Sequence, residues 1–158
     1  MSKQNIIRLS ISLAICYLAG AVGSIFTRPA VEYWYQSLIK PGFAPPDWLF
    51  APVWLMLYAV MGFSFYLVWR SGLQNKDSRS AFILFLVHLL VNVGWSVAFF
   101  GFQSPFWGLM MIILLWGLIF ALVMAFAHVR SLAAVLLIPY WAWVTFAGVL
   151  NWTIWLLN

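Results

Sequence analysis

The sequence predicts an all-α integral membrane protein, a bundle of five transmembrane helices that forms a single domain over residues 1–158. Two observations predict this class. Hydrophobic residues make up 66% of the chain and charged residues only 7%, whereas a soluble domain carries about 25% charged residues. The apolar runs are also continuous rather than alternating, which is typical of membrane helices and not of the strands of a membrane β-barrel.

The spacing of the charged residues places the five helices. Three uncharged stretches hold 19, 22 and 28 residues, and each is long enough for one crossing of about 20 residues. The stretch between Arg79 and Arg130 holds 50 residues, enough for two crossings. Its break falls at 101–105, where turn residues precede Pro105 and a proline stops a helix. The expected helices are 8–27, 46–70, 79–101, 105–128 and 131–156.

The first apolar segment has two interpretations, a cleaved signal peptide or a retained helix. Lys3 and Arg8 would form the basic end of a signal peptide. The stretch 9–27 is longer than the usual apolar part of such a peptide, and we therefore expect a retained helix. The single cysteine, Cys16, lies within it and cannot form an intrachain disulfide.

The basic residues predict an orientation. With five crossings, the N-terminus shares one side of the membrane with the second and fourth connections. That side holds six of the eight Lys and Arg residues, so the positive-inside rule places the N-terminus in the cytoplasm. Because these residues lie in loops and not on a face of a soluble domain, we expect no nucleic-acid binding. The six are Lys3, Arg8, Arg70, Lys76, Arg79 and Arg130; Arg28 and Lys40 lie on the other side.

The first connection, residues 28–45, is long for a compact protein, and such loops are usually functional or disordered. Its aromatic residues favour burial over disorder, and its prolines stiffen the second half. Two interpretations stay open: a folded lid over the outer mouth of the bundle, or an aromatic anchor at the membrane interface. The aromatic residues are Tyr33, Trp34, Tyr35 and Phe43, and the prolines here and just beyond are Pro41, Pro45 and Pro46.

The ionisable residues do not favour a conventional enzyme. The three carboxylates, Glu32, Asp47 and Asp77, all lie near predicted helix ends, so they offer no acid–base pair within the membrane. No close spacing of Cys, His and Asp indicates a metal site, and we expect none. His88 is either a haem ligand or, as we favour, a hydrogen-bonding group within the bundle, and His128 is expected at the interface.

Flat aromatic side chains are abundant, with 11 Trp, 6 Tyr and 14 Phe. Several recur at intervals that place them on one face of a helix. Such faces are either the core of the bundle or the wall of a pocket that stacks a large planar ligand. They comprise Trp54 and Tyr58; His88, Asn92, Trp95 and Phe99; and Tyr140, Trp143, Ala147 and Asn151.

Three stretches of the chain resemble the TspO/MBR family, the tryptophan-rich sensory proteins related to the mitochondrial translocator protein. The resemblance covers nearly the whole chain, and the first stretch is long and specific. The stretches are Trp34-Tyr35-x-x-Leu38-x-Lys40-Pro41-x-x-x-Pro45-Pro46-x-Trp48-x-Phe50-x-Pro52-Val53-Trp54-x-x-Leu57-Tyr58, Asn92-Val-Gly-Trp95-Ser-Val-Ala-Phe99-Phe100-Gly101, and Pro139-Tyr140-Trp-Ala-Trp143-Val-Thr-Phe146-Ala-Gly-Val-Leu150-Asn151.

The resemblance implies a multi-pass protein of a bacterial cell membrane, with a cavity under the first loop that binds tetrapyrroles such as protoporphyrin IX or haem and other hydrophobic ligands. Sensing and transport are both implied roles, and no cofactor is required. The alternative is a light-dependent porphyrin-degrading enzyme in which Trp54 and Trp143 react. Arg28 and Lys40 are candidates to meet the ligand's propionates. The expected ligand-binding residues are Tyr35, Pro45, Trp54, Tyr58, Asn92, Trp95, Phe99, Trp143 and Ala147.

The chain departs from the family in one feature: no Lys or Arg follows Tyr140, which argues against the cholesterol-recognition motif of the mammalian members. The resemblance also implies a homodimer, which we expect to form through the third predicted helix. Gly94 and Ala98 on that helix form a pair of small residues that lets two helices approach closely in lipid. Two other pairs with the same spacing are Gly20–Ser24 and Gly117–Ala121.

Overall fold

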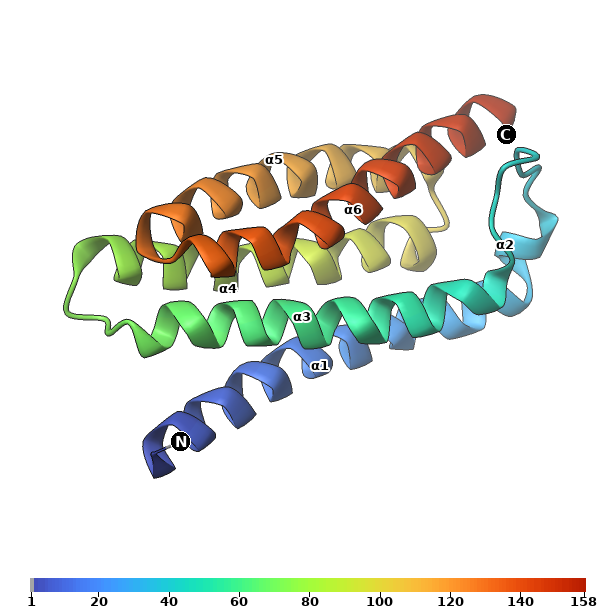
Figure 1. The fold of residues 1–158 in the computed structure, drawn as a ribbon. Helices are drawn as coiled ribbons and strands as arrows, with labels where there is room; N and C mark the ends of the chain where they lie inside the picture. Colours follow the sequence, from blue (N-terminus) through green and yellow to red (C-terminus); the bar gives the residue numbers. More distant parts are fainter. Residues whose placement is uncertain (1) are drawn as a thin grey trace.

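The computed structural model describes residues 2–158, and each of its five long helices runs antiparallel to the long helix before it (Figure 1). All five are long and apolar enough to cross a membrane, which confirms the predicted fold class, and residues 2–158 hold no strand. The long helices are α1 (Lys3–Glu32), α3 (Phe50–Arg70), α4 (Lys76–Ser96), α5 (Pro105–Val129) and α6 (Ser131–Leu157). The short ones are α2 (Trp34–Ser37), η1 (Asp47–Leu49) and η2 (Val97–Gly101), which continues α4.

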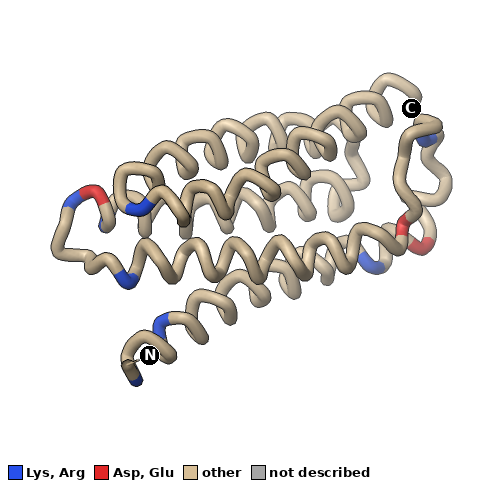
Figure 2. The backbone as a smooth tube through the Cα atoms, in the orientation of Figure 1, with Lys and Arg blue, Asp and Glu red and all other residues tan. Residues whose placement is uncertain are grey.

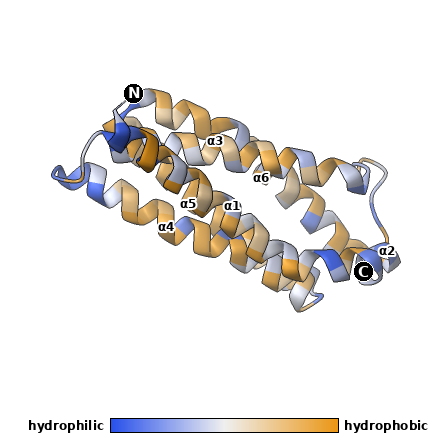
Figure 3. Cartoon of the chain, turned by 90° about the horizontal axis from the view of Figure 1, so that it is seen from below, coloured by the Kyte–Doolittle hydropathy of each residue, from blue (hydrophilic) through white to orange (hydrophobic). Residues whose placement is uncertain are grey.

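The distribution of polar residues along the bundle fits a membrane protein. The charged residues gather at its two ends, and the middle of every long helix is free of them (Figure 2). Hydrophobic residues cover the helices between these ends (Figure 3). Large apolar side chains such as Ile25, Leu90 and Val135 are exposed on this surface, as expected where the surroundings are lipid and not water. The chain is therefore a multi-pass integral membrane protein.

Helix α1 is longer at both ends than the charge pattern predicts. It begins at Lys3, where the Ser2 side chain accepts a hydrogen bond from the backbone N–H of Asn5, and it continues to Glu32 with Pro29 inside its last turns. Charged residues mark where a helix leaves the hydrocarbon, but they do not end it. As a result, the first residues of the predicted loop 28–45 are helical, and the segment that closes this end of the bundle is 34–46. We call this segment the lid.

The helices pack around one core in the order α1, α3, α6, α5 and α4, so that α3 lies between α1 and α6, and α4 lies between α5 and α1. The N-terminal half of α1 diverges from the other four helices, while its C-terminal half stays close to α3 (Figure 1). A second, smaller cluster of buried residues lies at the lid end. It joins Tyr35 of α2 to Phe99 of η2 and to Leu150 and Ile154 of α6.

The pair of small residues expected to form a dimer interface has contacts within its own protomer. Ala98 of η2 is buried, Gly94 is half-buried, and a Cβ atom at Gly94 would lie 2.8 Å from the Met111 side chain of α5. The homodimer through this helix stays a prediction. Gly20 is likewise covered by the Tyr58 ring, whereas Gly117 has no atom near its missing Cβ and Ala121 is exposed.

This packing predicts a small effect for Gly94→Ala. The atom in the way is the terminal methyl group of Met111, a flexible side chain that can move aside. We expect the free energy of unfolding to fall by about 1 kcal/mol or less, and the fraction of dimer captured by crosslinking in native lipid to stay unchanged. A loss of the crosslinked dimer without a loss of stability would place Gly94 in a dimer interface.

Candidate ligand-binding cavity

The lid end of the bundle holds a partly open cavity of about 580 Å³. Its size falls within the range of small-molecule sites, and its lining comes from α1, α3, α4, η2 and α6, with α2 and Asp47 of η1 at the lid. The lining residues are Gly20, Gly23, Ser24, Thr27, Arg28, Val31, Glu32, Tyr35, Asp47, Phe50, Ala51, Trp54, Tyr58, Asn92, Trp95, Ser96, Phe99, Phe100, Ala147, Leu150, Asn151 and Ile154.

Aromatic rings form much of the cavity wall. Trp54 and Tyr58 come from successive turns of α3, with ring centroids 5.5 Å apart. Trp95 and Phe99 are stacked, with centroids 5.6 Å apart and an angle of 18° between their planes. Contacts of this kind contribute about 0.5–1.5 kcal/mol each beyond the area they bury. The cavity therefore presents preformed ring faces from two sides of the bundle.

A wide helical turn places two neighbouring phenylalanines in this wall. In η2 the backbone N–H of Phe102 donates to the carbonyl of Val97, five residues earlier, at 2.8 Å. A regular α-helix bonds residues four apart and turns about 100° per residue, which separates neighbouring side chains widely. The extra residue in this turn reduces that separation, and both Phe99 and Phe100 line the cavity. Such π turns are frequent at functional sites.

Small residues of α1 leave the space that the cavity occupies. A Cβ atom at Gly20 would lie 2.5 Å from the Tyr58 ring, and one at Gly23 would lie 3.0 Å from Ser96 Oγ. Ser24 and Thr27 continue this face, and each turns its hydroxyl to a carbonyl of its own helix, Ala21 and Gly23 respectively. The α1 wall therefore consists of short side chains whose hydroxyl groups are already hydrogen-bonded, and it presents a largely apolar surface to a ligand.

A chain of hydrogen bonds forms the inner end of the cavity. The Tyr58 hydroxyl donates to Asn92 Oδ1 at 2.9 Å, and Asn92 Nδ2 donates to the Tyr140 hydroxyl at 3.0 Å. His88 Nε2 lies 2.9 Å from the same hydroxyl. His88 and Tyr140 are fully buried behind the cavity wall, so His88 bonds within the bundle. Residues 2–158 contain no cluster of His, Cys, Asp or Glu that could hold a metal ion.

Asn151 is held by two hydrogen bonds of its own. Its Oδ1 accepts from Trp95 Nε1 at 3.4 Å, and its Nδ2 donates to the carbonyl of Pro105 at 2.8 Å. The amide thereby ties α6 to α4 and to the start of α5. A polar side chain within a membrane span is costly unless it is paired in this way. Asn151 thus fixes the orientation of the Trp95 ring.

The mouth of the cavity carries charges of both signs. Arg28, Glu32 and Asp47 belong to the lining. Lys40 lies outside the lining, 3.6 Å from Asp47 Oδ1, in the only salt bridge among residues 2–158. Gln36 Nε2 also donates to Asp47 Oδ2, at 2.6 Å. Of the two cations expected to meet a ligand's carboxylates, Arg28 lies at the cavity and Lys40 holds the lid together.

The lid closes this end of the cavity through α2. Tyr35 is buried against Phe99 and Phe100, and Lys40 Nζ lies 4.1 Å from the centroid of its ring. Burial, together with the nearby Asp47 carboxylate, raises the pKa of Tyr35 to about 12. Tyr35 is therefore neutral over the physiological pH range, and no phenolate charge disturbs the apolar contact that it makes with η2.

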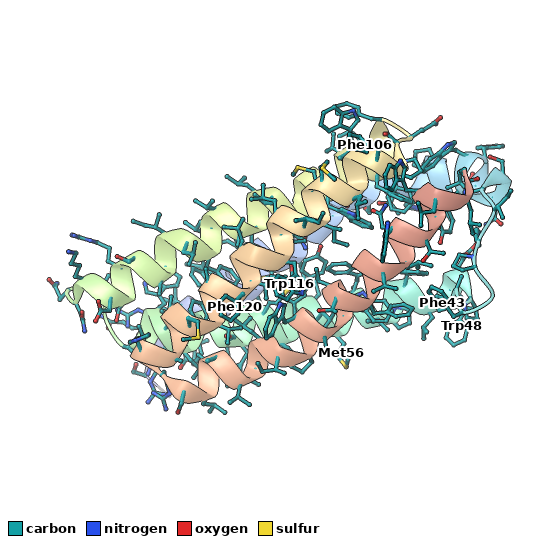
Figure 4. The ribbon with its side chains drawn as sticks, turned by 90° about the horizontal axis from the view of Figure 1, so that it is seen from above. Phe43, Trp48, Met56, Phe106, Trp116 and Phe120 are labelled. Carbon is teal, nitrogen blue, oxygen red and sulfur yellow. The ribbon has the colours of Figure 1, made fainter. Side chains whose placement is uncertain are left out.

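The outer surface of the lid has the character of an interfacial anchor. Tyr33, next to the lid, is 78% exposed and Phe43 is 51% exposed, contrary to the expected burial of the aromatic residues in this connection. Trp48, at the start of the next span, is 71% exposed. Phe43 and Trp48 lie at the lid end of the bundle, whereas Met56 and Phe120 lie along its length (Figure 4). The two interpretations of the loop both apply, because Trp34 and Tyr35 face inward while the others face outward.

An amide after α6 fastens the lid. Asn158 Oδ1 accepts from the backbone N–H of Ile39 at 3.0 Å, and Asn158 Nδ2 donates to the Ile39 carbonyl at 3.1 Å. We expect Asn158→Ala to speed the release of a bound ligand roughly fivefold to tenfold, since two hydrogen bonds of about 0.5–1.5 kcal/mol each are lost. Release into lipid vesicles measures this rate.

The matched control is Asn75→Ala, which removes a side-chain hydrogen bond to Asp77 N at the start of α4, far from the lid. Its release rate should equal that of the unaltered chain. Equal release rates for Asn158→Ala and the unaltered chain would mean that the lid does not control exit.

Seven of the nine predicted site residues line the cavity, and Pro45 and Trp143 do not. Pro45 lies outside because α1 extends to Glu32 and α2 then covers the mouth, which moves the proline segment away from it. Trp143 lies outside the lining and packs on Phe50 and Phe146, with ring centroids 5.8 and 5.5 Å away. Of the two tryptophans expected to react in a porphyrin-degrading enzyme, only Trp54 lies at the cavity.

Apart from Arg28, the α1 residues of the cavity wall were not predicted from the sequence. Gly20, Ser24, Thr27 and Val31 all line the cavity, and they follow one another at the i, i+4, i+7, i+11 spacing of a single helix face. Aromatic residues drew attention to the other helices, whereas a face of small residues carries no chemical signal. The spacing could have identified this face as one that packs closely or leaves room for a ligand.

A second hollow lies on the outside of the bundle, between α5 and α6. It measures about 390 Å³ and includes Trp116, Gly148 and Trp152 in its lining. Trp116 Nε1 donates to Thr145 Oγ1 at 2.9 Å, so two of the few polar groups in the groove are paired with each other. Trp116 lies midway along the bundle (Figure 4). This groove shares no lining residue with the cavity at the lid end.

A five-helix membrane bundle with an aromatic cavity and a lid is the architecture of a membrane receptor or sensor. The sequence model of the TspO/MBR family matches residues 12–156, and the chain belongs to this family. It is 43% identical to the tryptophan-rich protein TspO of Chlorobaculum tepidum, over all of this chain and 99% of that protein. It is 38% identical to Protein CrtK of Rhodobacter capsulatus, over 90% of this chain and 88% of that protein. It is also 38% identical to the human translocator protein, over 85% of this chain and 80% of that protein.

Proposed function

We propose that this protein is a membrane receptor that binds a flat hydrophobic ligand in the cavity at the lid end, and that the ligand is a tetrapyrrole such as protoporphyrin IX or haem. The observation that carries the proposal is the combination of a cavity of about 580 Å³ with ring faces from α3, α4 and η2. Aromatic side chains bind planar rings by stacking. The resemblance to the tryptophan-rich sensory proteins supplies the class of planar ligand.

The charges at the mouth support one orientation of the ligand. The inner part of the cavity is lined by rings and small residues, and the only cation in the lining is Arg28. A tetrapyrrole that enters with its apolar edge first leaves its propionates beside this guanidinium, which binds carboxylates well. Glu32 and Asp47 lie in the same region, and the Lys40–Asp47 pair already offsets one of these negative charges.

Membrane orientation and assembly complete the proposal. Six of the eight basic residues lie at the end opposite the lid (Figure 2), which favours a cytoplasmic N-terminus in a bacterial membrane and a lid on the outer side. A homodimer through α4 would use its outward face, where Ile83, Val87 and Leu90 are exposed at helical spacing. Leu90→Trp should then weaken the crosslinked dimer, whereas Gly117→Trp on α5 should not.

The test of ligand binding is a titration of the protein in nanodiscs with protoporphyrin IX, followed by the absorbance of the porphyrin. We expect one ligand per chain, and Trp54→Ala should weaken binding roughly tenfold or more, because stacking on one aromatic side chain contributes about 1–3 kcal/mol. The control is Trp152→Ala, which removes an exposed tryptophan from the outer groove. No binding, or binding that depends on Trp152 and not on Trp54, would contradict the proposal.

A further inference from the structure

Four side chains connect the inner end of the cavity to the centre of the bundle. Tyr58 and Asn92 belong to the cavity lining, whereas Tyr140 and His88 lie behind it with no exposed surface. Three hydrogen bonds of 2.9, 3.0 and 2.9 Å join them in the order Tyr58, Asn92, Tyr140 and His88. These side chains come from three helices, α3, α4 and α6, so the packing of the bundle fixes their hydrogen bonds.

The donors and acceptors available in this chain of hydrogen bonds set the direction of each bond. An amide nitrogen only donates and an amide oxygen only accepts. Asn92 Oδ1 therefore takes the single hydroxyl hydrogen of Tyr58. The Tyr140 oxygen accepts from Asn92 Nδ2, and His88 Nε2, 2.9 Å away, is the acceptor available to the Tyr140 hydrogen. We therefore assign to His88 the tautomer that accepts at Nε2 and carries its hydrogen on Nδ1, which has no hydrogen-bond partner within residues 2–158.

We infer that the Tyr58 oxygen, whose hydrogen is committed to Asn92, is a free acceptor at the inner end of the cavity, and that among ligands of equal size the cavity favours those with an N–H or O–H group at their buried end. The apolar edge of a tetrapyrrole leaves this acceptor unused. This inference rests on the proposed function, because it requires a ligand in the cavity. His88 acts as a positioning residue: it touches no ligand, but it takes the Tyr140 hydrogen and so keeps all three bonds pointing away from the cavity.

Removal of the acceptor at His88 should reverse the donor and acceptor roles in the hydrogen bonds that join Tyr140, Asn92 and Tyr58. With phenylalanine at this position, the Tyr140 hydrogen has no partner on that side and turns toward Asn92. The amide then rotates to present its oxygen to Tyr140 and its nitrogen to Tyr58. The Tyr58 hydrogen becomes free to point into the cavity, and Tyr58 becomes a donor. His88→Phe should therefore change which ligands bind well without altering any residue of the cavity lining.

The experiment uses three flat tricyclic probes of nearly the same shape: carbazole, which has an N–H group, and dibenzofuran and fluorene, which do not. Each displaces protoporphyrin IX from the protein in nanodiscs, and partition into protein-free nanodiscs is subtracted. Relative to Tyr58→Phe, the unaltered chain should prefer carbazole over dibenzofuran by about 3- to 10-fold, the value of one neutral hydrogen bond. The comparison with fluorene separates this preference from ring size.

The His88 variant provides the readout that a purely structural role would not change. His88→Phe should abolish or invert the carbazole preference, while fluorene binds within about twofold of its original affinity. His128→Phe is the control, because His128 is exposed near the end of α5 and bonds only to the carbonyl of Met124. A general loss of packing would weaken all three probes equally, and that result, or an unchanged preference in His88→Phe, would contradict the role of His88.

The outcomes for this inference and for the proposed function are distinct. If protoporphyrin IX and the tricyclic probes bind but carbazole has no advantage that depends on Tyr58, the inference is wrong and the proposed function stands. If protoporphyrin IX binds and none of the tricyclic probes displaces it, the inference is also overturned. If none of the ligands binds, both the inference and the proposed function are contradicted.

Discussion

Ser24→Trp should abolish most ligand binding while the bundle stays folded. Ser24 lies on the α1 wall of the cavity, and its hydroxyl bonds only to the carbonyl of Ala21 in its own helix. An indole at this position extends into the cavity and occupies the space between the rings of α3 and α4. A planar ligand then loses its stacking contacts, about 1–3 kcal/mol for each ring face, and the affinity for protoporphyrin IX should fall roughly 100-fold.

The control for this substitution is Ala21→Trp on the same helix. Ala21 is exposed on the outer side of α1 and does not line the cavity, so the added indole contacts only lipid. Affinity should stay within about twofold of the original value, and both variants should keep the thermal stability of the unaltered chain. Undiminished binding by Ser24→Trp would place the ligand elsewhere.

Gly108→Ala should destabilise the protein strongly for so small a change. A Cβ atom at this position would lie 2.5 Å from the Phe99 ring and 2.8 Å from Asn151 Oδ1. Phe99 is buried between α5 and the cavity, and Asn151 is held by its bonds to Trp95 and Pro105. Neither can move without breaking other contacts, so we expect a loss of about 2–3 kcal/mol in the free energy of unfolding, measured in detergent. Ligand affinity should fall as well, because Phe99 belongs to the cavity wall.

Gly117→Ala on the same helix tests this explanation. No atom lies within 4 Å of a Cβ atom at Gly117, and alanine is a better helix former than glycine by about 1 kcal/mol. The stability of this variant should be equal or slightly higher. Similar losses for Gly108→Ala and Gly117→Ala would show that the effect comes from helix propensity and not from the contacts of Gly108.

Charge spacing predicted the five crossings because a charged side chain cannot rest in hydrocarbon, and the uncharged stretches therefore match the membrane thickness. The same reasoning failed at Pro29 and Glu32, because a helix can continue beyond the hydrocarbon into the interface. The lid consequently starts later than predicted, and Tyr35, not the proline segment, covers the cavity. A proline inside a helix marks a local loss of one hydrogen bond, which the last turns of α1 tolerate.

Helix periodicity identified Trp54, Tyr58, Asn92, Trp95, Phe99 and Ala147 as members of inward faces, and all six line the cavity. Trp143 was placed with them although it lies about 60° from Tyr140 around α6 at 100° per residue, which turns it toward Phe50. Phe100 could not be predicted, because the wide turn at Val97–Gly101 changes the register that periodicity assumes. The packing of Gly94 was equally hidden, since a pair of small residues has the same spacing whether it faces its own bundle or a second copy.

The most direct test of ligand binding in the cavity is to map where a light-activated tetrapyrrole attaches to the chain. A protoporphyrin derivative that carries a diazirine is bound in native lipid and irradiated, and the labelled peptides are identified by mass spectrometry. We expect labels on the cavity walls, within residues 20–31 of α1 and 95–100 of α4 and η2, and their loss in Ser24→Trp. Labels at Trp116 and Trp152 in the outer groove, unaffected by Ser24→Trp, would contradict binding in the cavity.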